Sequence, residues 1–298
     1  MADRFIASRA TRGGAAREIF VSAVQFDEQL KSGSRTVLDL APVAAAVGAR
    51  GVEYRDVYWK DKATELPAVK RRLAELKLKA AYTTMTPLYN WEPAQQQQLL
   101  RDVEDARDLG AVLLRINLGR RPGPGPADAK THYAGRMAVE RAAALRVHLT
   151  LENNSTEPGH LLSDVKETLD TFSCRFFGTN IDFANYVATG QDPLEAIRGL
   201  ARWINYVHAK DARKTAAGWQ STYLGDGSLP LREIIGALDS TGKAVPFCFE
   251  FPGGDDPEGS IRKSLEFLAT WMVEDTGQAR PGQRNHGGYR RGCGLVRW

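Results

Sequence analysis

Cysteine, histidine and long hydrophobic runs are all scarce in this chain of 298 residues. The three cysteines, Cys174, Cys248 and Cys293, lie far apart, form no CxxC pair and cannot all pair within one chain. No apolar run reaches the roughly 18 residues that cross a bilayer, and the N-terminal segment has no apolar stretch long enough for a secretory signal. We therefore expect a protein of the reducing cytoplasm with no membrane partner.

Positive charge is scarce in the body of the chain, although the formal net charge is +4. Residues 276–298 contain five arginines and no acidic residue, and residues 1–17 contain four arginines and one aspartate. The two ends together therefore carry +8, which leaves −4 for residues 18–275. A basic stripe on the folded part, which is typical of a nucleic-acid-binding face, is not evident, so no nucleic-acid partner is expected.

Apolar, strand-like segments alternate eight times with segments of helical periodicity. Strict alternation of this kind predicts a parallel sheet, and eight units over about 255 residues fit a closed barrel better than an open doubly wound sheet. No GxGxxG motif follows the first strand, which weakens the open, dinucleotide-binding alternative. The predicted strands cover residues 18–26, 51–57, 79–85, 111–119, 147–154, 176–185, 204–211 and 245–253.

These patterns predict an α/β protein with one (β/α)8 (TIM) barrel as its catalytic domain over residues 18–275. Residues 1–17 are predicted to be an N-terminal leader. Residues 276–298 form a basic, Gly/Arg-rich tail outside the pattern, either disordered or docked on another subunit, so a homo-oligomer is one expectation.

Polar residues occupy one face of the last four predicted strands. Because side chains along a strand point to opposite faces with a period of two, Glu152, Asp182, His208 and Glu250 are predicted to face into the barrel. Successive members are 30, 26 and 42 residues apart, which is about one β/α unit each. The four side chains are therefore expected at matching heights on neighbouring strands.

Buried charges are costly unless they are paired or coordinate a metal. Carboxylates crowded into one cavity repel each other, and a divalent cation removes that repulsion. Two glutamates, one aspartate and one histidine form an oxygen-rich set that suits Mn²⁺, Mg²⁺ or Co²⁺ more than structural Zn²⁺. We predict one divalent ion, with Mn²⁺ as first choice and Mg²⁺, Co²⁺ or Zn²⁺ as alternatives; the other interpretation is ordinary polar residues at strand ends.

Three segments resemble a known family: LTLENN at 149–154, residues 178–211, and residues 223–252. The chain resembles the xylose isomerase-like barrel superfamily, specifically its sugar isomerase and epimerase group. The resemblance implies that Glu152, Asp182, His208 and Glu250 bind one metal ion and that the two glutamates transfer the proton.

The chain departs from that family at two positions. Many relatives have histidine where Asn154 stands, and the epimerases have histidine where Asn185 stands. Both residues are expected to touch substrate, so the pattern of substrate hydroxyls stays open. The DNA-repair endonucleases of the superfamily need several further histidines for a three-metal cluster. This chain has five histidines in all, and only His208 occupies a strong site position.

Further residues are predicted to contact substrate. Lys210 would hold a substrate oxygen or support Glu250, with a salt bridge to Asp211 as the alternative. Arg213 resembles the arginine that bonds substrate hydroxyls in the epimerases, and Arg115 would line the pocket floor or pair with Glu53. Sugars often stack on aromatic rings, although a loop tryptophan also serves in packing. The complete substrate-binding set is Lys210, Arg213, Asn185, Asn154, Arg115, Asn117 and Trp219.

The first functional hypothesis is a metal-dependent sugar isomerase or epimerase. A keto sugar or polyol-derived substrate would pass through a metal-bound enediolate, with one glutamate removing a proton and the other returning it. The second hypothesis is a lyase or dehydratase that uses the same site on a keto sugar. A DNA-repair endonuclease and an inactive partner subunit are the remaining, less favoured alternatives.

Overall fold

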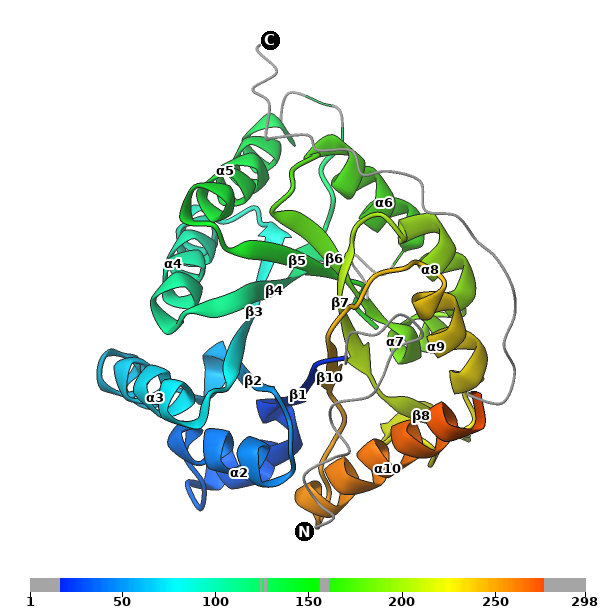
Figure 1. Ribbon diagram of the computed structural model, residues 1–298. Helices are drawn as coiled ribbons and strands as arrows, with labels where there is room; N and C mark the ends of the chain where they lie inside the picture. Colours follow the sequence, from blue (N-terminus) through cyan, green and yellow to red (C-terminus); the bar gives the residue numbers. More distant parts are fainter. Residues whose placement is uncertain (1–16, 124, 126–127, 156–160, 276–298) are drawn as a thin grey trace.

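Eight parallel strands close into a barrel in the ring order β1-β10-β7-β6-β5-β4-β3-β2, and helices surround it (Figure 1). The computed structural model describes residues 17–275 except 124, 126–127 and 156–160. The barrel strands are β1 (Ile19–Ser22), β2 (Gly51–Arg55), β3 (Lys79–Tyr89), β4 (Ala111–Gly119), β5 (His148–Glu152), β6 (Phe177–Asp182), β7 (Ile204–Ala209) and β10 (Phe247–Phe249). The predicted (β/α)8 barrel is thus confirmed.

The helices follow the strands along the chain. They are α1 (Asp27–Ser32), α2 (Leu40–Ala46), α3 (Lys62–Leu76), α4 (Pro93–Leu109), α5 (Ala129–Leu145), α6 (Leu162–Thr171), α7 (Phe183–Ala188), α8 (Pro193–Leu200), α9 (Leu231–Asp239) and α10 (Pro257–Asp275). Three short 3₁₀ segments, at Ala23–Phe26, Val37–Asp39 and Asp56–Tyr58, complete the order. None of the helices in the described ranges is both long and apolar enough to cross a bilayer.

Local sequence explains where individual helices begin and end. The side chain of Asp192 accepts a hydrogen bond of 2.8 Å from the backbone nitrogen of Leu194, and Pro193 occupies the first position of α8. This is a favourable N-terminal cap, because the first amides of a helix have no partner within the helix. Helix α4 ends at Leu109, and the following residue, Gly110, has a φ of 78°, a left-handed conformation that costs glycine little.

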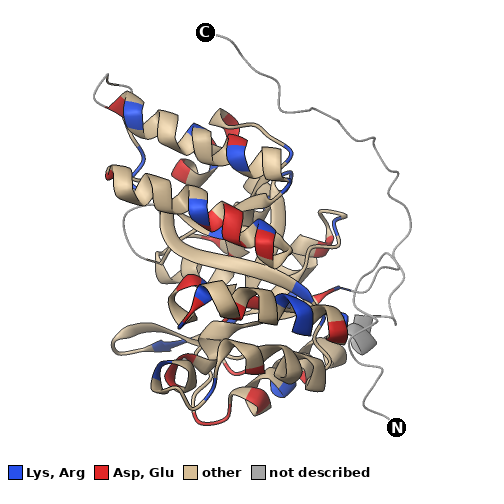
Figure 2. Ribbon diagram, turned by 90° about the vertical axis from the view of Figure 1, so that its left-hand side faces the viewer, with Lys and Arg blue, Asp and Glu red and all other residues tan. Residues whose placement is uncertain are grey.

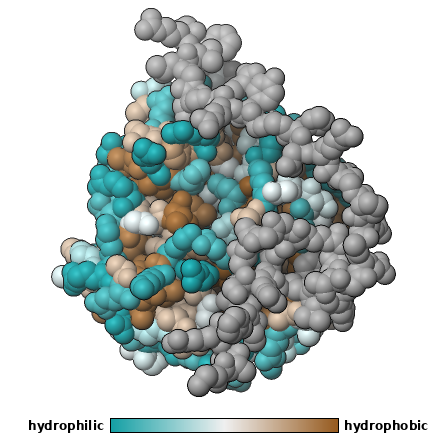
Figure 3. Space-filling view, in the orientation of Figure 1, coloured by the Kyte–Doolittle hydropathy of each residue, from teal (hydrophilic) through white to brown (hydrophobic). Residues whose placement is uncertain are grey.

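The main core lies between the strands and the helices. Leu149 and Leu151 of β5 are completely buried on the outward face, as the period of two predicts. In the orientation of Figure 1, hydrophobic residues are visible toward the middle of the described surface and hydrophilic ones around its rim (Figure 3). Acidic and basic residues are interspersed along the helices in the side view (Figure 2). The polar strand residues lie on the opposite, inward face of the barrel strands.

Several predicted boundaries are wrong in detail. The strands predicted over 18–26 and 245–253 contain only the short strands β1 and β10, whereas β3 extends beyond its predicted end at 85 to Tyr89. After β7 the chain forms an antiparallel hairpin of β8 (Asp211–Thr215) and β9 (Gly218–Thr222), which is not among the eight predicted strands. This hairpin carries mainly polar residues, most of them exposed or half-buried, and therefore lacks the apolar run that marks a barrel strand.

The two predicted terminal segments fall almost entirely outside the described residues. Residues 1–16 and 276–298 are not described, so the leader, the tail and a homo-oligomer built through the tail stay predictions. Arg17, the last residue of the predicted leader, is buried: it forms an ion pair of 2.5 Å with Asp239 and lies over the ring of Phe247. Arg17 therefore packs against the barrel.

Candidate metal and substrate site

The four residues predicted as metal ligands lie together at one end of the barrel. Asp182 ends β6, Glu152 ends β5, His208 lies within β7, and Glu250 directly follows β10. One ligand atom from each lies within 4.8 Å of the others. The structure thus brings the predicted set into one cluster, while its role in binding a metal stays a prediction.

Barrel register explains how four separate strands deliver these side chains. Asp182 and His208 are direct partners in neighbouring strands, so their predicted matching height is confirmed. Glu152 instead pairs with Asn180, and His208 pairs with Cys248, two residues before Glu250. The stagger between strands of a barrel lets side chains that differ by two residues in register reach a common point.

The imidazole of His208 presents its Nδ1 to the carboxylates. This nitrogen lies 2.6 Å from Oε1 of Glu152, 3.6 Å from Oε2 of Glu250 and 3.9 Å from Oδ2 of Asp182. His208 is completely buried, as are Glu152 and Asp182. The Nδ1 atom is therefore the ring atom available to an ion held between the three carboxylates.

The ammonium group of Lys210 lies among the same oxygens. Its Nζ is 2.6 Å from Oδ2 of Asp182 and 2.6 Å from Oε2 of Glu250. The alternative prediction of a salt bridge with Asp211 is wrong, because the Asp211 carboxylate accepts backbone N–H groups instead. Those donors belong to Ala212, Gly225, Gly227 and Leu229.

Arg115 is a buried partner of Glu152 rather than of Glu53. The guanidinium forms an ion pair with Oε2 of Glu152, and the amide of Asn180 donates to Oε1 of the same carboxylate at 3.2 Å. The alternative pairing of Arg115 with Glu53 predicted from sequence is therefore wrong. Since one carboxylate oxygen of Glu152 accepts a hydrogen bond and the other forms an ion pair, its orientation is fixed from two sides.

Charge at the site is unbalanced within the described residues. Four carboxylates and two cationic side chains gather at the cluster, which leaves a formal deficit of two positive charges when His208 is neutral. The cations pair with three of the carboxylates, and the fourth, Glu53, pairs with His208. The carboxylates are Glu53, Glu152, Asp182 and Glu250, and the cations are Arg115 and Lys210. One divalent cation would remove this deficit, and three carboxylates with one imidazole nitrogen are donors that Mn²⁺ and Mg²⁺ accept. The residues present therefore fit such an ion.

The pKa shifts follow from the same crowding. Burial alone would lower the pKa of Lys210, but Asp182 and Glu250 raise it well above its ordinary value. Burial would raise the pKa of Glu250, but Lys210 and then His208 lower it far below its usual range. Burial raises the pKa of Asp182 and is only partly opposed by Lys210. The cluster thus holds more negative charge than its two cations fully stabilise.

A cavity of about 380 Å³ adjoins β3, β4 and the loops that follow them. Its lining includes Asn117 and Asn154, both predicted to contact substrate, together with Trp91. Asn117 is the register partner of Glu152, so one lining residue of this cavity lies beside a member of the carboxylate cluster in the sheet. Asn185 follows Asp182 by three residues, and its amide donates a hydrogen bond of 3.0 Å to the backbone oxygen of Asn153.

The other two predicted substrate contacts lie on the hairpin. Arg213 lies on β8, where its guanidinium bonds the carboxylate of Asp226 and its Nε donates to the Asp226 backbone oxygen at 2.8 Å. Trp219 lies on β9 opposite Lys214 and packs partly against the main core. Substrate contact by Arg213 and Trp219 stays a prediction.

Sequence reasoning missed the role of Asn153. Its Oδ1 accepts from the backbone nitrogen of Asp182 at 3.0 Å, and its Nδ2 donates to the backbone oxygen of Asp182 at 2.9 Å. These two bonds tie the end of β5 to the end of β6. The available signal was a buried polar residue directly after Glu152, on the opposite face from the predicted ligand.

With the fold and the geometry established, the chain can be compared with known proteins. Residues 41–271 match the xylose isomerase-like TIM barrel family. The chain belongs to this family. The resemblance inferred from LTLENN and the two later segments is thereby confirmed at the level of the family. A sequence comparison with curated proteins gives no match.

Solved structures with the same fold include three informative examples. An L-ribulose 3-epimerase is 17% identical with a TM-score of 0.69, over 90% of this chain and 100% of the other. A probable 3-DHS dehydratase from Bacillus anthracis is 18% identical with a TM-score of 0.67, over 84% and 98%. A family member from Mycobacterium smegmatis in complex with magnesium is 16% identical with a TM-score of 0.66, over 87% and 97%. At these identities the likeness concerns the fold alone.

Proposed function

We propose that this protein is a metal-dependent isomerase or epimerase acting on a keto sugar or a polyol-derived substrate. One observation carries the proposal: two glutamates, Glu152 and Glu250, approach a single candidate cation site from strands that β6 and β7 separate in the ring. The family membership and the likeness to an L-ribulose 3-epimerase are consistent with this reaction class. We further propose a small-molecule partner, no nucleic acid, and a cytoplasmic location.

Glu152, Asp182, His208 and Glu250 would hold the ion. A divalent cation, with Mn²⁺ as first choice and Mg²⁺, Co²⁺ or Zn²⁺ as alternatives, would supply Lewis-acid polarisation of a substrate carbonyl. Glu250 is 14% exposed at its side chain and Glu152 only 1%, so Glu250 is the more accessible of the two carboxylates. One glutamate would remove the proton next to the carbonyl, and the other would return a proton on the opposite face.

Neighbouring residues would keep each base in place. Arg115 and Asn180 hold Glu152, and Lys210 holds Glu250. A base that is fixed before substrate binds loses less entropy during proton transfer. The cavity beside Asn117 and Asn154 would accept the remainder of the substrate.

A lyase or dehydratase is the second candidate. After removal of the same proton, the electron pair would expel a leaving group from the β carbon instead of accepting a proton on the other face. The likeness to a probable 3-DHS dehydratase favours keeping this alternative. Only one of the two glutamates would then be needed as the base that removes the proton.

Incubation of the metal-reconstituted protein with a panel of keto sugars tests the proposal. Protein loaded with Mn²⁺ is expected to convert at least one sugar, and chelator-treated protein to convert none. Mass spectrometry of the product distinguishes the candidates, because isomerisation conserves mass and dehydration removes one water. A protein that retains no metal and converts no member of the panel would contradict the proposal.

A further inference from the structure

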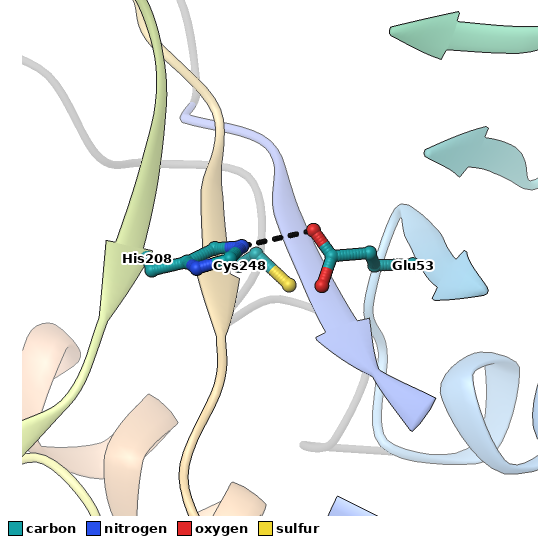
Figure 4. A group of neighbouring side chains, drawn as sticks. All are labelled: Glu53, His208 and Cys248. Atoms are coloured by element: carbon teal, nitrogen blue, oxygen red, sulfur yellow. Dashed lines mark hydrogen bonds and ion pairs between the residues drawn. The ribbon is translucent and has the colours of Figure 1, made fainter. Parts of the chain in front are cut away.

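The second ring nitrogen of His208 faces away from the candidate cation site. Its Nε2 lies 2.9 Å from Oε2 of Glu53, and both side chains are buried in the barrel interior. Figure 4 shows the two groups pointing toward each other from β7 and β2, with Cys248 of β10 beside them. Glu53 belongs to none of the roles assigned above, although it touches one of the four candidate ligands.

Glu53 is itself held in place. Its second oxygen, Oε1, accepts a hydrogen bond of 2.9 Å from the hydroxyl of Ser22, its register partner in β1. The Glu53 side chain is only 2% exposed, so water offers no substitute for these two partners. A carboxylate anchored at one oxygen and bonded to an imidazole at the other is a rigid support.

The imidazole of His208 needs such a support because one ring nitrogen must bind the ion while the other carries the hydrogen. Only an Nδ1 with a free lone pair can bind an ion between the carboxylates, and in that neutral tautomer the hydrogen is on Nε2. A carboxylate that accepts this hydrogen fixes both the tautomer and the direction of the ring. Tyr206 packs edge-on against the ring, with centroids 5.7 Å apart, but a ring contact does not select a tautomer.

We infer that Glu53 is the positioning residue for metal binding: by accepting the Nε2 hydrogen of His208, it holds Nδ1 toward Glu152, Asp182 and Glu250. This inference rests on the metal-dependent function proposed above. Glu53 would touch neither the ion nor the substrate. Its contribution is to affinity for the ion and to the direction of the imidazole.

Cys248 offers a competing interpretation of the same geometry. Its thiol, Glu53 and His208 each offer a ligand atom within 4.8 Å of the others, so they form a second candidate set for an ion. In the structure, however, the Nε2 atom of His208 already bonds Glu53, and the thiol lies beside that bond (Figure 4). Replacement of Cys248 by alanine therefore separates the two interpretations and is a matched control from the same cluster.

Titration with Co²⁺ in the absence of any substrate tests the inference. Loss of a carboxylate behind a metal-bound histidine typically weakens metal affinity about 10–100-fold, so we expect that decrease for Glu53→Ala. Glu53→Gln keeps an oxygen that can accept the Nε2 hydrogen and should recover most of the affinity. Cys248→Ala should bind Co²⁺ as wild type does, with one ion per chain.

A second measurement reports on the tautomer itself. In the Co²⁺-loaded protein, the hydrogen on Nε2 of His208 should give a paramagnetically shifted, exchangeable proton resonance in nuclear magnetic resonance spectra. It should persist in Cys248→Ala and vanish through rapid exchange in Glu53→Ala. If Glu53→Ala does not fold, Ser22→Ala provides the test, because a less firmly held Glu53 should accelerate that exchange. A merely structural role of Glu53 would lower the unfolding temperature without changing either signal.

The outcomes are distinguishable. Wild-type protein that binds no Co²⁺ would overturn the proposed metal-dependent function together with this inference. Wild-type binding with unchanged affinity and an unchanged resonance in Glu53→Ala would overturn the inference alone. Two ions per wild-type chain, reduced to one in Cys248→Ala, would assign Glu53 to a second metal site instead.

Discussion

The ammonium nitrogen of Lys210 lies 2.6 Å from Oδ2 of Asp182, inside the group of oxygens proposed to hold a divalent ion. The Asp182 side chain is completely buried and that of Lys210 nearly so. The same ammonium bonds Glu250, so Lys210 is the cationic partner of two of the three candidate carboxylate ligands. Lys210 and a bound ion would therefore share these oxygens, so the ammonium group and the ion should compete for them.

Lys210→Met tests this competition. The substitution keeps the side-chain length but leaves Asp182 and Glu250 without their ammonium partner. Removal of one partner from a buried ion pair costs about 3–5 kcal/mol, so we expect that decrease in the stability of the metal-free protein. Added Mn²⁺ should restore stability, because the carboxylates regain a cation. The rise in unfolding temperature on adding Mn²⁺ should thus be larger than for wild type.

Lys62→Met is the matched control for Lys210→Met. Lys62 forms an ion pair of 2.7 Å with Asp105 between α3 and α4, outside the carboxylate cluster and partly exposed. Exposed pairs contribute about 0–1 kcal/mol, so this variant should remain near wild type and respond to Mn²⁺ equally. A smaller response to Mn²⁺ in Lys210→Met than in wild type would contradict the competition.

Metal content provides the next prediction. Elemental analysis of protein purified without chelator and reconstituted with Mn²⁺ should give about one ion per chain, as a single four-ligand site requires. Asp182→Asn should lose most of that metal, because an amide is a weaker donor than a carboxylate. Asp102→Asn is the control: Asp102 is equally buried but bonds Thr84 and Thr86 at 2.8 and 3.1 Å, outside the cluster. Three ions per chain would refute the single site.

Sequence periodicity was sufficient for the face and the approximate height of each candidate ligand. Alternation alone assigned Glu152 and Asp182 to the barrel interior, because a strand offers only two faces. Alternation could not predict which charged side chains form ion pairs with each other. Arg115 bonds Glu152 rather than Glu53, and that choice depends on the tilt and stagger of the strands, which no single segment encodes.

The segment after β7 shows a second limit of prediction from sequence. Its hairpin has no apolar face to bury, so periodicity gave no signal for β8 and β9. Its anchor is Asp211, a buried carboxylate that accepts backbone hydrogens from three residues of the following loop. Sequence reasoning treated Asp211 only as a neighbour of Lys210, because contacts to backbone amides leave no side-chain pattern.

Asp211→Asn should therefore destabilise the fold. Hydrogen bonds to a charged group contribute about 1.5–3 kcal/mol each. The asparagine NH2 group is a donor, so it would face backbone N–H donors where a carboxylate oxygen accepts their hydrogens. We expect a loss of at least about 2 kcal/mol in the free energy of unfolding, measured by denaturant titration. Unchanged stability would show that the loop does not depend on this carboxylate.

Gly227→Ala tests the same anchor from the other side. A Cβ atom at this position would lie 2.2 Å from Oδ1 of Asp211 and 2.5 Å from the backbone oxygen of Ala212. The loop would have to move, so this variant should also be destabilised. The control is Gly236→Ala in α9, where a Cβ meets nothing within 4 Å and alanine is the better helix former by up to about 1 kcal/mol. Equal stability changes in the two variants would contradict the close approach at Gly227.

The last prediction concerns the proposed bases. Glu152→Gln and Glu250→Gln keep the shape and one oxygen donor of each side chain but remove its ability to take up a proton. General acid–base groups typically contribute about 10²–10⁴-fold, so each variant should lose at least that order of turnover on a confirmed substrate while retaining part of its metal. Cys248→Ala, which leaves both glutamates in place, should keep near-normal turnover.

Hydrogen exchange in deuterium oxide then distinguishes an epimerase from a lyase. In an epimerase, one face of the substrate keeps its base in each variant. One variant should therefore still exchange the substrate hydrogen for deuterium without completing inversion, because Glu152 and Glu250 would approach the substrate from strands that β6 and β7 separate in the ring. A lyase needs only one base to remove the proton, so one variant should be severely impaired and the other mildly. Near-normal turnover in both variants would refute the two-base mechanism even if the metal content were as expected, because neither carboxylate would then be moving the proton.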